Sequence, residues 1–93
     1  MLDSHMRGVL EKIIDQVITS IPRLQSSVRE EGKDKLQIKN EEDYMLGFVH
    51  GAIMSDFVTT FSAMNKRSIN LEENEEAQAV AFNRTAEVCA CIR

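Results

Sequence analysis

The stretch of residues 44–64 carries apolar side chains around nearly the whole circumference of a helix. At about 100° per residue, these side chains point in every direction from the axis. They are Tyr44, Met45, Leu46, Phe48, Val49, Ile53, Met54, Phe57, Val58, Phe61 and Met64. A helix that is apolar on all sides is a buried helix. Asn40, followed by three acidic residues, is a favourable cap, so we expect a central helix over residues 41–64 that other elements must cover.

A second helix is predicted over residues 7–30, before the central one. Its apolar residues recur at intervals of four and three, which is a heptad pattern. They are Leu10, Ile14, Val17, Ile21, Leu24 and Val28. Pro22 removes a backbone donor inside this segment, so the helix either kinks there or ends and restarts with Thr19 or Ser20 as a cap. The heptad pattern keeps its phase across Pro22, which favours a kinked helix, and Gly32 provides a stop.

The last helix is predicted to begin at residue 71, after an Asn70 cap with an acidic residue three positions later. We expect its polar side to face solvent and its apolar side to face the core. The polar side holds Glu72, Glu73, Glu76, Asn83, Arg84 and Glu87. The other side holds Leu71, Phe82 and Cys89 and, further round, Ala81, Val88 and Ile92. Cys91 falls on the polar side, so Cys89 should be the protected thiol. Residues 31–40 are charged and are predicted to form a loop.

These elements predict an all-α chain, a three-helix up-down-up bundle with its first helix kinked at Pro22. Residues 1–5 are interpreted as vector-derived and are set aside, which leaves residues 6–93 as one helical domain. Two neighbouring helices cannot cover a helix that is apolar all round, so we expect homo-oligomerisation to complete the bundle. The alternative is that the loop folds over the open face through Leu36 and Ile38.

Three small residues four apart, Gly47, Gly51 and Ser55, lie on one face of the central helix. Glycine in a helix costs about 1 kcal/mol relative to alanine, and a close approach by another helix would explain it. The approaching helix belongs either to the same chain or to a partner. The residues predicted for an interface combine this face with apolar positions of both helices: Leu10, Ile14, Val17, Gly47, Gly51, Ser55, Phe57 and Phe61.

The charge balance argues against several classes of partner. Eleven basic residues against fifteen acidic ones give a net charge of −4, and the basic residues are scattered. A nucleic-acid partner is therefore disfavoured, because such proteins usually carry a basic stripe; a regulator using Lys66, Arg67 and the 33–39 loop is a weaker alternative. Asp56 would sit near the middle of a bilayer, which argues against a membrane span. Two cysteines without a secretory signal favour the cytoplasm.

The sequence contains little that supports catalysis. Nucleophile motifs and phosphate-binding glycine loops are absent, and His50 and Asp56 lie about 120° apart on the helix. Glu72, Glu73, Glu75 and Glu76 form two Glu-x-x-Glu pairs, which suit a metal, but the second acidic pair that such a site needs is missing. We therefore expect no cofactor, no metal and a non-catalytic self-association or protein-interaction module. The alternative is a metal-dependent hydrolase of the helical nucleotide pyrophosphohydrolase type, which would use this glutamate cluster.

Overall fold

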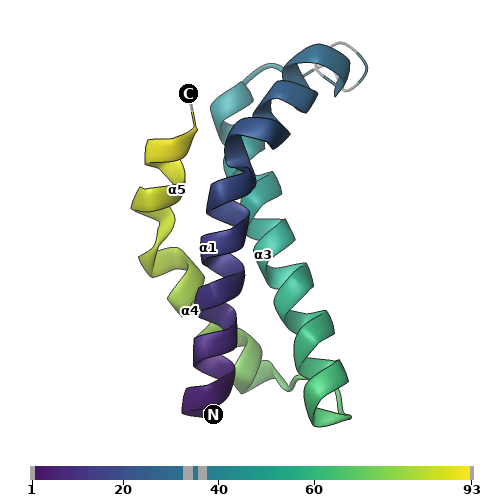
Figure 1. The fold of residues 1–93 in the computed structure, drawn as a ribbon, viewed down its shortest axis with the longest axis vertical. Helices are drawn as coiled ribbons and strands as arrows, with labels where there is room; N and C mark the ends of the chain where they lie inside the picture. The colour runs from purple at the N-terminus through teal and green to yellow at the C-terminus, as the bar shows by residue number, and fades with distance from the viewer. Residues whose placement is uncertain (1, 33–34, 36–37, 93) are drawn as a thin grey trace.

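The chain runs up, down and up again as a set of helices packed side by side (Figure 1). The computed structural model describes residues 2–32, 35 and 38–92, and in this part of the chain every regular element is helical. The elements are α1 (Ser4–Ser27), the π-helical η1 (Val28–Gly32), α3 (Glu41–Asn65), α4 (Leu71–Asn83) and α5 (Thr85–Cys91). The all-helical class is confirmed. The described part has four α-helices rather than the predicted three, because the last one is divided at Arg84.

Helix α1 begins earlier than predicted. The Asp3 carboxylate accepts a hydrogen bond from the Met6 N–H at 2.8 Å and caps the helix. The Leu2 N–H donates to Glu76 Oε2 on α4 at 2.6 Å. Residues 2–5, which were set aside at the sequence level, therefore take part in the fold.

Pro22 lies inside α1 without ending it. The helix continues through Ser27 and passes directly into η1, which ends at Gly32 as the glycine predicts. The alternative of an end and a restart near Pro22 is therefore wrong. Of the two residues expected to cover the open face, Ile38 is half-buried against the core, and Leu36 lies outside the described residues.

Helix α3 matches its prediction closely at both ends. The Asn40 side chain accepts from the Asp43 N–H at 3.0 Å at the start. At the end, Lys66 takes a left-handed conformation (φ 54°), and its N–H donates to the Ser62 carbonyl at 2.9 Å. A left-handed residue of this kind is a common helix terminator.

The core lies where α1, α3 and the α4–α5 arm meet. From α3 it takes residues spaced strictly four apart, namely Met45, Val49, Ile53, Phe57 and Phe61. From α1 it takes most of the heptad positions, and from the last arm Ala77, Val80, Ala81 and Val88. Helix α3 is not buried on all sides, because the side chains of Phe48 and Met64 are 42% and 46% exposed.

The predicted orientation of the last helix is wrong in part, since Ala81 and Val88 are buried as expected but other residues are not. Leu71 and Phe82, expected to face the core, are 73% and 57% exposed, whereas Glu73 is buried. The inner side of the arm is formed mainly by Ala77, Val80, Ala81 and Val88, so the arm is rotated from the predicted orientation rather than reversed. Glu73 is bound by Arg67, and Arg84 by carboxylates on α1 and α5. These ion pairs offset the cost of placing the two charged residues next to the core.

Candidate association surface

The side of α3 opposite its buried line consists of small residues. Gly47, Gly51, Ser55, Thr59 and Ala63 each follow a buried residue by two positions, and all five are exposed. Two residues correspond to about 200° of helix rotation, so the two lines lie on opposite sides. We call these five residues the outer face of α3. In Figure 1, no other helix lies over the side of α3 that is turned away from α1.

The two glycines of the outer face have no packing neighbour in this chain. A Cβ atom built at Gly47 or Gly51 would meet no atom within 4 Å. The interpretation that these glycines admit another helix of the same chain is therefore wrong. Their cost to α3, about 1 kcal/mol each relative to alanine, is not offset by any contact within the described part of the chain.

Charged side chains are scarce on this helix. Between Tyr44 and Asn65, Asp56 is the one residue among Asp, Glu, Lys and Arg, and His50 is the one histidine. Solvent-facing positions of a helix normally carry charged residues, because an amphipathic helix places them opposite its buried stripe. The outer face has instead the composition of a helix–helix contact.

Exposed aromatic side chains border the outer face. On one side, Phe48 is 42% exposed and lies 6.0 Å from the Tyr44 ring between centroids. On the other side, Phe82 of α4 is 57% exposed and stacks on His50, with centroids 4.9 Å apart and planes inclined by 12°. The sequence alone had placed Phe82 in the core, so its part in this surface was missed.

Two shallow hollows flank the outer face. The first, of about 450 Å³, lies between α3 and the α4–α5 arm. Its lining residues are Asp43, Leu46, Gly47, His50, Phe82 and Thr85. The second, of about 390 Å³, lies between α1 and α3 and includes Phe48, Ala52, Asp56 and Arg23. Such hollows beside a smooth ridge can receive side chains of a partner helix.

Most of the residues predicted for an interface lie inside the chain's own core. Their exposures are between 0% and 8%, for Leu10, Ile14, Val17, Phe57 and Phe61. Gly47, Gly51 and Ser55 are exposed. Of the eight predicted residues, these three are accessible to a partner in this structure.

The glutamate cluster of α4 is occupied by contacts that hold the fold together. Glu73 accepts two hydrogen bonds from Arg67, at 2.8 and 2.7 Å, and one from the Asn70 N–H. The Arg67 hydrogen bond, followed by that of Asn70, lowers the pKa of Glu73 to about 2. Glu76 accepts from the Leu2 N–H. Among the described residues, no group of three or more His, Cys, Asp or Glu side chains is placed to hold a metal ion.

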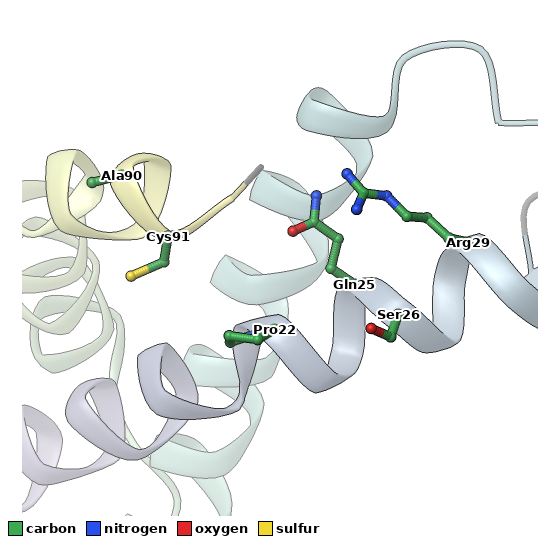
Figure 2. Close-up of a pocket in the computed structure, with 6 residues that line it drawn as sticks. All are labelled: Pro22, Gln25, Ser26, Arg29, Ala90 and Cys91. Atoms are coloured by element: carbon green, nitrogen blue, oxygen red, sulfur yellow. The ribbon is translucent and has the colours of Figure 1, made fainter.

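A separate hollow of about 420 Å³ lies between α1 and α5 (Figure 2). Its lining residues are Pro22, Gln25, Ser26, Arg29, Ala90 and Cys91. Gln25 and Arg29 extend from α1 and η1 toward α3, where both bind the Glu41 carboxylate. No carboxylate or imidazole is among these lining residues.

The two thiols are placed the other way round from the prediction. Cys89 is exposed, and Cys91 is half-buried, packed against the core cluster. The error has the same origin as that for Phe82, because the arm is rotated so that Phe82 and Cys89 lie outside its inner side. Val88 and Cys91 share the side of α5 that packs inward.

Searches against protein-family models, curated proteins and solved structures found no match to this chain. Within the residues that the structure describes, no helix has both the length and the apolar character that crossing a bilayer requires.

Proposed function

We propose that this chain is a non-catalytic association module that binds another protein helix through the outer face of α3. The observation that carries the proposal is that Gly47 and Gly51 lie within a helix, are exposed, and have no atom of the described chain within 4 Å of where a Cβ would stand. A helix retains glycine at a cost in stability, and close approach of a second backbone is the physical gain that offsets it. In this proposal the partner completes the helical bundle.

The extent of exposed surface supports the proposal. A compact monomer of this mass, 10.5 kDa, exposes about 5,400 Å² by the usual scaling of surface with mass. This chain exposes 6168 Å². The excess of about 700 Å² is close to the roughly 800 Å² that each partner buries in an interface of standard size.

The other candidate functions find no comparable support. A hydrolase would need the α4 carboxylates for a metal ion, and Glu73 and Glu76 are engaged within the chain. The free thiols Cys89 and Cys91 support a working place in a reducing compartment such as the cytoplasm.

The substitution Gly51→Leu tests the proposal. A side chain at this position meets no atom of its own chain, so the monomer should fold and α3 should become more stable by up to about 1 kcal/mol. Association should be lost, because the leucine would hold the partner helix away. Light scattering over a range of concentrations measures the association, and circular dichroism checks the fold.

Gly8→Leu is the matched control. Gly8 is also an exposed helical glycine with no atom within 4 Å of a built Cβ, but it lies on α1, away from the outer face. The control should associate like the parent chain. If Gly51→Leu associates as strongly as Gly8→Leu does, the outer face of α3 is not the binding surface.

A further inference from the structure

We propose that the partner is a second copy of this chain, with the two α3 helices antiparallel across a two-fold axis at Ser55. This inference rests on the proposed function, since it identifies the occupant of the same outer face. A two-fold dimer uses the same patch on both copies, so the patch must be complementary to itself. The outer face meets that condition in its shape and in its charge.

The shape is self-complementary about Ser55. In an antiparallel pair, each residue before Ser55 faces the residue the same number of places after it in the other copy. Gly51 then faces Thr59, so the glycine meets a small residue with a Cβ beside the axis. A line of residues four apart turns by about 40° around the helix at each step, so Gly47 and Ala63 lie farther from this contact. Small residues at a spacing of four permit this close packing of helices.

The charges at the two ends of α3 are opposite. Asp43 lies one step of four before Gly47 on the same line, and the basic residues Lys66 and Arg67 follow the last residue of α3. Asp43 is exposed, as are Glu42 beside it and Lys66 at the other end. Arg67 keeps about half of its side chain exposed while it binds Glu73. An antiparallel pair thus brings the acidic end of each copy to the basic end of the other.

A parallel pair would be unfavourable by the same argument. It would place Asp43 and Glu42 of one copy against the same carboxylates of the other, together with two helix N-termini of like partial charge. Like charges in juxtaposition at an interface disfavour the wrong arrangement. Antiparallel helices also bring the positive end of each helix dipole near the negative end of its neighbour. The charges therefore select the orientation, while the small residues set the distance.

Disulfide trapping tests this arrangement. The parent for the test carries Cys89→Ser and Cys91→Ser, so that an introduced thiol is the only one present. Ser55→Cys in this background should form a disulfide-linked dimer on mild oxidation, because the axis brings the two Ser55 positions together. Disulfides require Cα atoms roughly 4.4–6.8 Å apart, which closely packed helices permit. Gly51→Cys alone should stay unlinked, and an equimolar mixture of Gly51→Cys and Thr59→Cys should cross-link.

Gly8→Cys, an exposed position on α1, is the control for random collision and should not cross-link. Cross-linking of Gly51→Cys to itself would overturn the antiparallel arrangement in favour of a parallel one. A parent that dimerises by light scattering while Ser55→Cys stays unlinked would overturn the axis at Ser55. A different outcome is a parent that is monomeric by light scattering and binds another protein through the outer face. That result would show that the partner is not a second copy, and it would agree with the proposed function. If no protein binds the outer face and Gly51→Leu changes nothing, the proposed function itself fails.

Discussion

At the scale of single residues, the pair of Arg67 and Glu73 fixes the turn between α3 and α4. Two short hydrogen bonds join the guanidinium to the carboxylate, and the same carboxylate accepts the Asn70 N–H in a capping box. The Arg67 guanidinium also lies 4.9 Å from the centre of the Phe61 ring. The Glu73 carboxylate thus caps α4 and also binds the guanidinium of Arg67, which follows the end of α3.

Stability at acidic pH should depend on Glu73. Its folded-state pKa is about 2 against an ordinary value of 4.5, because Arg67 and the Asn70 N–H stabilise the ionised form. A pKa that is lower in the folded state stabilises the fold above pH 4.5, and this contribution is lost as the pH falls toward 2. We expect Glu73→Gln to melt several degrees below the parent at neutral pH, and the difference in Tm to shrink toward pH 2.

The matched control is Glu75→Gln, which removes an exposed charge from the same helix without touching Arg67. Its effect on Tm at neutral pH should be much smaller. If the Tm of Glu73→Gln lies as far below that of the parent at pH 2.5 as at pH 7, the Glu73 side chain acts through packing rather than through its charge.

At the scale of elements, Arg84 joins three helices where α4 gives way to α5. The residue leaves helical geometry (φ −104°, ψ 10°). Its guanidinium contacts Asp15 on α1 at 2.6 Å and Glu87 on α5 at 2.7 Å, and the Glu11 carbonyl at 3.3 Å. These hydrogen bonds raise the pKa of Arg84 and lower that of Glu87. A seven-residue helix is too short to be stable alone, so α5 depends on such contacts.

Removal of the Arg84 charge should loosen α5 more than the rest of the chain. Arg84→Met keeps much of the aliphatic bulk and removes the guanidinium. We expect amide hydrogen exchange in Thr85–Cys91 to become about fivefold faster, as befits a partly exposed ion-pair network, with little change in α1 and α3. Arg23→Met, on an exposed position of α1, should leave exchange in α5 as it is in the parent. Equal acceleration in α1 and α5 would contradict a local role for Arg84.

At the scale of the whole molecule, the chain is extended and carries a long uncovered side. Its principal dimensions are 40 × 23 × 19 Å, and its radius of gyration is 14.2 Å. A compact domain of this length has a radius of gyration of about 12 Å. The helices thus lie as elongated neighbours around a narrow core, and α3 has one side against that core and the other toward solvent.

Association predicts that thermal stability depends on protein concentration. If folding and dimer formation are linked, mass action favours the folded dimer as the concentration rises. A hundredfold increase should raise Tm by about 5–10 °C for a domain of this size. Scanning calorimetry or circular dichroism at several concentrations measures the shift. Gly51→Leu is the control, because its monomer should still fold and its Tm should not change with concentration. If the Tm of the parent does not change with concentration either, the parent is a monomer.

The sequence by itself determined the elements of this protein, because helix signals are local. Each of these signals acts within a few residues. They are the apolar pattern of residues 44–64, the caps at Asn40 and Asn70, and the stop at Gly32. The structure places helix ends at or beside the two caps and the glycine. The exposed glycines of the outer face were also visible as a pattern.

Only the tertiary structure decided which side of the last arm faces inward. The arm buries Val80 and Val88 together with Glu73, and Arg84 is half-buried as part of an ion-pair network. The pairs depend on Arg67, Asp15 and Glu11, which lie on other elements. Those carboxylates and guanidinium groups are brought together by the fold, and a helical wheel of one segment contains no information about them. The same long-range contacts turn Phe82 outward beside α3 and so complete the surface on which the proposed association rests.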